Sequence, residues 1–265
     1  MARPRGRPRH PVVLAVRRAG GRLLARPGRR VRRSPPRVGT RWNPPVIESS
    51  DRRQLSDLAI FPLPDAVLLP GALLPLHVFE QRYRDMVRDV LADDRLLGIA
   101  RLRPGYEADY YGRPPVYDTC GVGVIVADEA LDDGRYNILV RGLGRARIEE
   151  ELAVATSYRR VRARVLPDGR SRRPEVVSAT FDQLIALCGR LADAIGDDAE
   201  PLCDLMSHAA SPAACADLLG AALMRDPDER QRLLETLDPA DRLEAVLARV
   251  SHLLAKVGPS NTMLN

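Results

Sequence analysis

The chain has 265 residues, of which 45% are hydrophobic and 29% are charged, an ordinary composition for a globular protein that needs no disulfide or structural metal to hold its core. Its net charge of +6 combines two unlike parts, because residues 1–50 hold fourteen arginines and one acid and sum to +13, whereas the remaining residues sum to −7. No apolar run approaches about 18 residues, so we expect no transmembrane helix and no membrane partner.

Residues 1–50 are predicted to be a disordered extension. Eight prolines and charge of essentially one sign leave too few apolar residues to offset the entropy of ordering. The apolar run Pro11–Val16 is shorter than that of a secretory signal, and the prolines oppose the amphipathic helix of a transit peptide. A nucleic-acid-binding arm stays open as an alternative.

Short strands are predicted between residues 58 and 166, where apolar residues alternate or run continuously between Pro, Gly and Asp. The predicted strands are Ala59–Leu63, Leu96–Arg101, Val122–Val126, Tyr136–Val140 and Tyr158–Leu166, with a further extended segment at Val67–Leu69. A turn at Asp132-Asp133-Gly134 joins two of them into a hairpin. In the last strand, apolar residues alternate with Arg160, Arg162 and Arg164, so one face is core and the other carries solvated guanidinium groups. This density of strands predicts a small, partly closed β-barrel.

One amphipathic helix is predicted within the strand region. Apolar residues recur at helical spacing at Phe79, Tyr83, Met86, Val87, Val90 and Leu91. Glu80 and Arg84 are one turn apart and are expected to pair on the side of this helix. More generally, we interpret Glu80 with Arg82 or Arg84 as an ion pair or cap that fixes the helix.

From Pro174 onward the apolar period becomes helical. One long helix is predicted over Val177–Ile195, and three later helices each begin with a capping residue followed by proline, at Ser211-Pro212, Asp226-Pro227 and Asp238-Pro239. The predicted fold class is therefore α+β, with a barrel followed by a helical bundle. We divide the chain into a disordered extension at 1–50, a barrel at 51–170, a bundle at 171–258 and a disordered tail at 259–265.

Sequence motifs for nucleotide hydrolysis and peptide cleavage are missing. A Walker loop needs Gly-Lys followed by Ser or Thr, but the only lysine, Lys256, precedes Val257. This lysine lies near the end of the last predicted helix, with Ser251 and Ser260 as its nearest serines in sequence, which nearly excludes a Ser-Lys nucleophile pair. Gly121-Val-Gly123 lacks a third glycine and a following helix, so we interpret it as a strand approached closely by other backbone. We expect no catalytic residue and no cofactor.

A metal site is also not expected. Cys203, His208 and Cys215 have four and six residues between them in a helical segment, which is an unsuitable spacing for zinc. We interpret the four cysteines as reduced thiols of a cytosolic protein. His77 precedes the predicted helix in an apolar setting, where we expect its ring to hydrogen-bond to backbone rather than to act as ligand or base.

Tyrosines gather in one irregular segment. Residues Arg103–Asp118 hold four of the seven tyrosines, which are Tyr106, Tyr110, Tyr111 and Tyr117. Tyrosine offers a large apolar area and a polar tip, which is typical of recognition loops. Two interpretations remain open, a contact surface for polypeptides formed by Tyr106, Tyr110 and Tyr111, or a lid folded back onto the barrel.

Three stretches carry a family resemblance. These are FPLPDAVLLPGALLPLHVFEQRYRDMV, GVGVIVADEALDDGRYNILVRGLGRARI and DPDERQRLLETLDPADRLEAVL. In this order they resemble the N-terminal substrate-binding domain of Lon proteases, over roughly Leu58 to Lys256. The resemblance implies a PUA-like barrel followed by a helical bundle, which together engage polypeptide substrates. It also implies that the motif residues His77, Phe79, Glu80, Arg82 and Tyr83 are architectural and carry no catalytic group.

In Lon proteases an ATPase domain and a Ser-Lys peptidase domain follow this domain, whereas here the chain ends at Asn265. We therefore expect a stand-alone, non-catalytic cytoplasmic module that binds exposed segments of other polypeptides, as an adaptor in protein quality control. RNA binding through the barrel and its arginine face is the alternative. A peptidase is a third possibility, for which we expect no activity. A homo-oligomer stays open.

Overall fold

The structure is a computed structural model that describes residues 54–257. The extension predicted at 1–50 and the tail predicted at 259–265 lie outside the described residues. Within residues 54–257, no helix is both long and apolar enough to cross a membrane.

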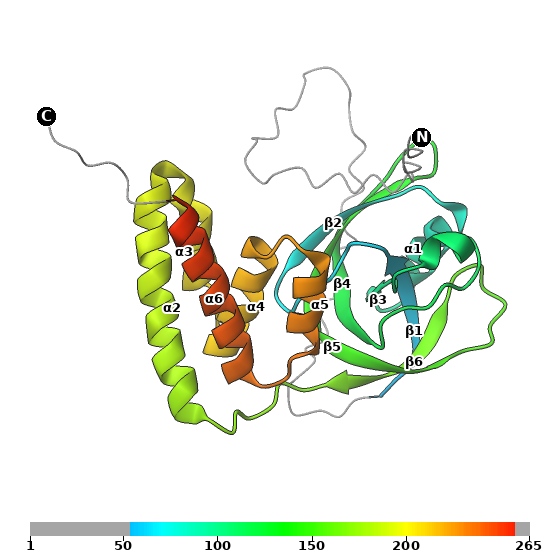
Figure 1. Cartoon of the computed structure of the whole chain (residues 1–265). Helices are drawn as coiled ribbons and strands as arrows, with labels where there is room; N and C mark the ends of the chain where they lie inside the picture. Colours follow the sequence, from blue (N-terminus) through cyan, green and yellow to red (C-terminus); the bar gives the residue numbers. More distant parts are fainter. Residues whose placement is uncertain (1–53, 258–265) are drawn as a thin grey trace, which may run out of the picture.

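A ring of β-strands forms the first half of the described chain (Figure 1). The strands are β1 (Gln54–Leu63), β2 (Leu73–Val78), β3 (Leu96–Arg101), β4 (Thr119–Ala130), β5 (Tyr136–Glu151) and β6 (Arg160–Leu166). Their order is β2-β5-β4-β3-β1-β6, and an additional pairing of β5 with β6 closes the ring. The first half of β5 pairs with β2 and the second half with β6, so β2 lies outside the closed part. The predicted partly closed barrel is confirmed.

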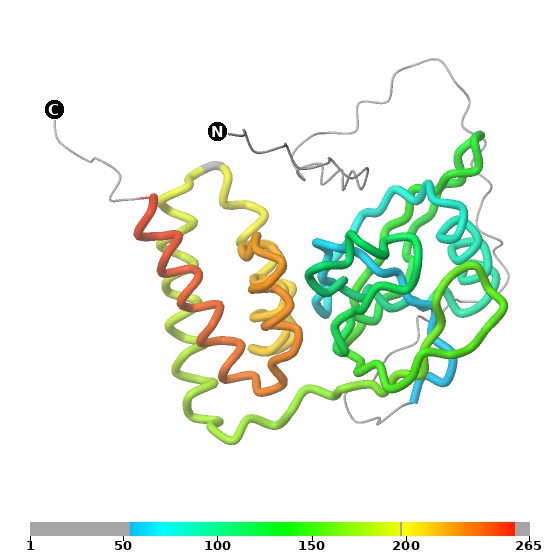
Figure 2. Tube along the Cα trace, turned by 45° about the vertical axis from the view of Figure 1, so that its right-hand side comes forward, coloured from blue at the N-terminus to red at the C-terminus, as the bar shows by residue number. Residues whose placement is uncertain are grey.

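The helices other than α1 follow the barrel and pack beside it (Figures 1 and 2). These later helices are α2 (Pro174–Ile195), α3 (Glu200–Ser207), α4 (Pro212–Leu223), α5 (Pro227–Glu235) and α6 (Pro239–Val257), with a short 3₁₀ helix η2 (Gly196–Ala199). The helix α1 (Gln81–Ala92) and the short 3₁₀ helix η1 (Tyr106–Asp109) lie between strands of the barrel. All three predicted cap positions are confirmed. Ser211 Oγ accepts a hydrogen bond from the Ala214 amide at 3.1 Å, and Asp226 and Asp238 each accept one from the amide two residues later at 2.9 Å.

The segment between β1 and β2 connects the two hydrophobic cores. Leu68 lies in the barrel core with the buried face of α1, whereas Val67 and Leu69 lie in the core of the helical bundle. This segment, for which we predicted an extended backbone, belongs to no strand of the sheet. A Cβ on Gly121 would lie 2.0 Å from the carbonyl oxygen of Leu68, and one on Gly142 2.2 Å from that of Leu69. The close backbone approach predicted for the Gly121 segment is therefore confirmed.

The division into separate units with a boundary near residue 170 stays a prediction. Side-chain contacts cross between the barrel and α5. Arg101 of β3 pairs with Asp228 of α5 at 2.7 Å, and Gln231 of α5 donates to the carbonyl oxygen of Thr119 in β4 at 3.1 Å. The barrel and the bundle thus contact each other through α5.

Candidate functional site

The junction between β2 and α1 places the family-signature residues beside the tyrosine loop. Glu80, the residue before the first helical residue, forms an ion pair with Arg82 at 3.0 Å. It also accepts a hydrogen bond from the Tyr110 hydroxyl at 2.8 Å. The predicted Glu80–Arg84 pair is wrong, because Glu80 precedes the helix and its side chain does not lie in the i, i+4 row. Arg84 instead reaches the hairpin turn, where a Cβ on Gly134 would lie 1.9 Å from its Nη2.

His77 is held by side chains, not by backbone as we expected. Its Nδ1 lies 2.8 Å from the amide oxygen of Asn137, its cross-strand neighbour on β5, and its Nε2 lies 3.2 Å from Arg135 Nη1. The expectation was wrong because the backbone groups of β2 and β5 already hydrogen-bond to each other in the sheet. The imidazole ring therefore bonds to side chains of the neighbouring strand. Phe79 follows with its ring 6.3 Å from that of His77 and is 36% exposed. Tyr83 is buried, and burial raises its pKa to about 12.

The tyrosine loop is partly anchored and partly exposed. The guanidinium of Arg82 lies 4.7 Å from the ring centroid of Tyr83 and 5.5 Å from that of Tyr110. Burial and the hydrogen bond to Glu80 raise the pKa of Tyr110 above its usual value. Tyr111 packs edge-on against Tyr110 at 5.2 Å yet is 84% exposed, whereas Tyr106 is half-buried. The loop therefore combines features of both open interpretations, with Tyr110 as anchor and Tyr111 pointing to solvent.

Tyr117 takes no part in this arrangement. The guanidinium groups of Arg101 and Arg103 lie 5.2 and 5.1 Å from the centroid of its ring. These contacts hold Tyr117, at the end of the tyrosine loop, beside the end of β3.

A pocket of about 260 Å³ lies between the start of α1, the tyrosine loop and the segment before β6. We call it the tyrosine pocket; it is lined by Pro62, Arg82, Tyr83, Leu102, Tyr110, Tyr111, Gly112, Arg113, Pro114, Thr156, Ser157, Tyr158 and Arg159. Arg159 is fixed by two hydrogen bonds to Glu151, at 2.7 and 3.0 Å, and donates to the Pro114 carbonyl at 2.7 Å. Aromatic rings beside fixed guanidinium groups suit stacking and hydrogen bonding with a side chain. The lining includes no His, Cys or Lys to act as base or nucleophile.

The arginine face of β6 is neutralised by neighbouring carboxylates. Arg162 pairs with Glu150 at 2.6 Å and Arg164 with Glu149 at 2.9 Å, across the β5–β6 ladder. Arg160 pairs with Asp57 of β1 at 2.6 Å. The guanidinium groups that we expected to be simply solvated therefore lie in ion pairs, which reduces the positive charge that this face offers to a ligand.

The candidate metal ligands do not come together. Cys215 is buried, whereas Cys203 and His208 are exposed. Over residues 54–257, no group of three or more His, Cys, Asp or Glu side chains has an arrangement that could hold a metal ion. Burial raises the pKa of Cys188 to about 11, so this thiol stays protonated at neutral pH.

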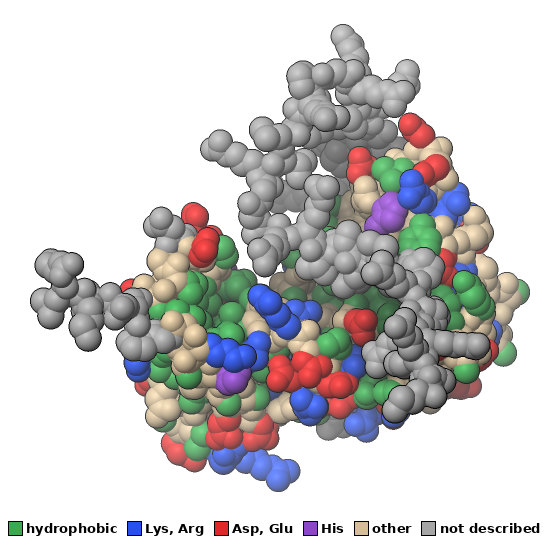
Figure 3. Space-filling view, turned by 45° about the horizontal axis from the view of Figure 1, so that its top comes forward, with side chains coloured by type: hydrophobic (Ala, Val, Ile, Leu, Met, Phe, Trp, Pro, Cys, Tyr) green, Lys and Arg blue, Asp and Glu red, His purple; other side chains and the backbone are tan. Residues whose placement is uncertain are grey.

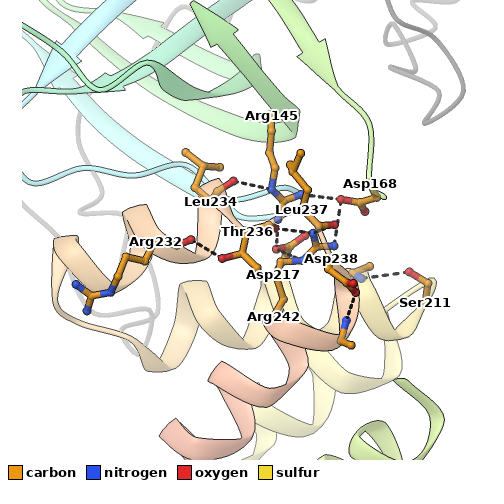
Figure 4. Close-up of polar contacts among 12 residues, drawn as sticks. Arg145, Asp168, Ser211, Asp217, Arg232, Leu234, Thr236, Leu237, Asp238 and Arg242 are labelled. Carbon is orange, nitrogen blue, oxygen red and sulfur yellow. Dashed lines mark hydrogen bonds and ion pairs between the residues drawn. The ribbon is translucent and has the colours of Figure 1, made fainter. Parts of the chain in front are cut away.

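Sequence reasoning missed a buried ionic cluster between the barrel and the bundle. Figure 4 shows Arg145 extending from β5 toward Asp168, Asp217 of α4 and Arg242 of α6. Arg145 Nη1 and Arg242 Nη2 each lie 3.0 Å from Asp168 Oδ1. Asp217 pairs directly with Arg145 and lies 3.5 Å from Arg242 Nε. The exposed fractions of Arg145, Asp217 and Arg242 are only 2%, 1% and 0%.

This cluster had one signal in the sequence. Asp217 is the only charged residue of α4, where a lone carboxylate among apolar residues indicates a buried partner. The sequence does not reveal which of the many arginines supplies that partner. Burial lowers the pKa of the Arg145 guanidinium, and the carboxylate of Asp217 opposes that shift. The cluster holds the orientation of bundle and barrel and is structural.

Comparison with known proteins agrees with the resemblance noted from the sequence. Residues 57–252 match the family model of the ATP-dependent protease La (LON) substrate-binding domain. The chain is 29% identical over 204 residues to Lon protease 2 of Myxococcus xanthus and 31% identical over 198 residues to Lon protease of Roseiflexus castenholzii. These matches cover 77% and 72% of this chain but 24% and 23% of the relatives, so the chain spans about a quarter of their length.

A solved structure shows the same fold. The N-terminal domain of Mycobacterium avium complex Lon protease superposes with a TM-score of 0.57 at 21% sequence identity, over 74% of this chain and 98% of that one. What matches is thus the substrate-binding part of these proteases and not their catalytic part. The chain belongs to the Lon substrate-binding domain family.

Proposed function

We propose that this chain binds exposed segments of other polypeptides at the tyrosine pocket and does not hydrolyse them. The observation that carries the proposal is the geometry of Tyr111. This ring is 84% exposed on a loop that Tyr110, Glu80 and Arg82 anchor to α1. An aromatic side chain held at low entropic cost beside fixed arginines is what polypeptide-binding surfaces use as an anchor.

The absence of catalysis is supported by the only lysine. Lys256 is exposed near the end of α6, and Ser251, one turn before it, donates its hydroxyl to the Leu247 carbonyl at 2.8 Å. A serine in such a bond, five residues from the lysine on an exposed helix, is not arranged as a nucleophile with a base. An adaptor role in protein quality control, a cytoplasmic location and self-association stay predictions.

RNA binding is less favoured than polypeptide binding. The barrel type and the arginines of β6 suggested it, but Arg160, Arg162 and Arg164 each have a carboxylate partner. Binding to phosphates needs unpaired positive charge and shows a steep dependence on salt.

The test is binding of labelled casein, a protein without a stable fold, to the full chain and to Tyr111→Ser. The dissociation constant should rise about tenfold, because truncation of an anchoring tyrosine costs roughly 1–2 kcal/mol. The melting temperature should not change, since the side chain is exposed. Ile185→Ser on α2, where the side chain is 37% exposed, is the matched control and should bind normally.

An unchanged dissociation constant for Tyr111→Ser would remove the tyrosine pocket from the binding site. If the chain binds a labelled RNA oligonucleotide as tightly as casein or more tightly, and this binding is lost at high salt, RNA binding would replace polypeptide binding as the proposed function. A single substitution tests the pocket more cleanly than a triple replacement of Tyr106, Tyr110 and Tyr111 would. The triple variant would also break the Tyr110–Glu80 bond and loosen the loop.

A further inference from the structure

A second hollow, distinct from the tyrosine pocket, lies between the helical bundle and the barrel. It is a groove of about 780 Å³, which is within the range of ligand-binding pockets, about 300–1,000 Å³. We call it the α3–α4 groove; it is lined by Pro70, Gly71, Asp168, Pro201, Asp204, Leu205, His208, Ala210, Ala214, Asp217, Leu218 and Ala222. Two-thirds of these residues are apolar, so the groove offers an apolar surface to an occupant.

One wall of the groove is a helix that is apolar on every side. The sequence of α4, PAACADLLGAAL, has a single charged residue, and a helix of this kind is normally covered all round. Its inner side packs in the bundle core through Cys215, Ala216 and Leu219. Its outer side presents Ala214, Leu218 and Ala222 to the groove, at a spacing of four residues.

The same region carries unbalanced negative charge. Residues 191–224 hold six acids and no Lys or Arg. Asp193, Asp198, Glu200 and Asp204 are exposed, and none forms an ion pair with another described residue. Figure 3 shows that hydrophobic and acidic side chains both reach the surface of the helical part. An occupant that complements this wall is apolar and positively charged.

This chain contains such a segment. Residues 7–18 read RPRHPVVLAVRR, in which the apolar run Pro11–Val16 has two arginines on each side and no acid. We propose that this segment of the chain's own N-terminal region docks in the α3–α4 groove, with its apolar run against α4 and its arginines beside the acids of α3. The inference does not rest on the proposed function, because it concerns a different surface.

The connecting chain is long enough for this contact. Gln54, the first described residue, pairs with Arg164 of β6, which is four residues before Asp168 at the edge of the groove. The 37 residues between Val16 and Gln54 span about 35 Å as a flexible coil and over 100 Å when extended. A tethered segment of this reach has an effective concentration on the order of millimolar, so even weak intrinsic affinity gives substantial occupancy.

The experiment places a nitroxide spin label on the full chain at Cys203, the exposed cysteine of α3, since the other three cysteines are buried. Backbone amide signals of residues 12–16 are then recorded by NMR. We expect them to lose more than half their intensity at low salt and to recover at 0.5 M salt. Arg17→Gln with Arg18→Gln, and separately Leu14→Ser, should restore the signals. The melting temperature of each variant, measured alongside, should equal that of the unsubstituted chain.

Groove variants test the other side of the contact. Asp198→Asn, Glu200→Gln and Asp204→Asn together should restore the signals. The charge-matched control, Glu107→Gln with Asp132→Asn and Glu175→Gln, removes three exposed acids away from the groove and should leave the broadening intact.

Three results would overturn the proposal. Signals of residues 12–16 that are never broadened would show that the segment does not dock. Broadening that weakens on dilution would assign the groove to a second copy of the chain. Shifts of the Leu218 and Ala222 amides on addition of casein, without broadening of residues 12–16, would assign it to other polypeptides.

Discussion

Replacing Asp217 by Asn tests whether the buried ionic cluster fixes the bundle to the barrel. The carboxylate is 1% exposed and lies between two guanidinium groups that are themselves 2% and 0% exposed. Its removal leaves Arg145 and Arg242 to share Asp168 alone. Breaking a buried pair costs about 3–5 kcal/mol, and we expect the lower value because the Asn oxygen still accepts one hydrogen bond. The melting temperature should fall by about 6–12 °C, measured by calorimetry and by urea unfolding.

The matched control is Glu150→Gln, which breaks the exposed pair with Arg162, in which N and O are only 2.6 Å apart. Since both side chains are about half exposed, the loss should stay below about 1 kcal/mol. Joint replacement of Arg145 by Met and Asp217 by Leu should destabilise less than Asp217→Asn, because no charge is then left without its partner. A loss below about 1 kcal/mol for Asp217→Asn, or equal losses for Asp217→Asn and Glu150→Gln, would refute the reasoning.

Three further predictions concern packing, capping and titration. Gly121→Ala should lower the free energy of unfolding by at least about 2–3 kcal/mol, because its Cβ would meet the Leu68 carbonyl. Gly189→Ala in α2, with open space around it, should raise the free energy of unfolding by about 0.5–1 kcal/mol. Urea unfolding that changes this free energy in the same direction for both variants would contradict the prediction. Ser211→Ala should cost about 1 kcal/mol in the same assay through loss of the α4 cap, and no change would mean that the bond to Ala214 is not made. Because the pKa of Tyr110 is raised in the folded state, its bond to Glu80 contributes fully to the free energy of unfolding below pH 10.0, and this contribution is lost as the pH rises through the raised pKa. Absorbance titration should show one late-titrating tyrosine fewer in Tyr110→Phe than in the unsubstituted chain. An unchanged count would place this hydroxyl in water.

Local chemistry explains what the sequence predicted correctly. The three cap-proline pairs mark the starts of α4, α5 and α6 because a cap involves only the next few residues. The apolar period placed α1 and part of β1, β3, β4, β5 and β6 for the same reason, but the strand β2 was not predicted. The predicted Glu80–Arg84 pair was wrong because Glu80 is the N-cap residue of α1. Its side chain therefore does not lie on the same helical face as that of Arg84 and pairs with Arg82.

What the sequence did not predict depends on contacts between distant residues. We predicted five-residue arms for the hairpin, but β4 has 12 residues and β5 has 16. The second half of β5, with Gly142, Gly144 and alternating arginines, resembles a polar loop. It is a strand because β4 and β6 flank it and because Arg145 finds Asp217, 72 residues away. No local pattern identifies such a partner.

The closure of the ring also sets the order in which the barrel forms during synthesis. Among the strands of the barrel over residues 54–257, β1 leaves the ribosome first, but β6, its antiparallel neighbour, follows only about 100 residues later, which takes roughly 5–20 s of translation. During this interval one hydrogen-bonding edge of β1 is open to any extended chain nearby. The nascent barrel is thus most vulnerable to aggregation before its last strand emerges, and helper proteins that cover exposed edges would act at this stage.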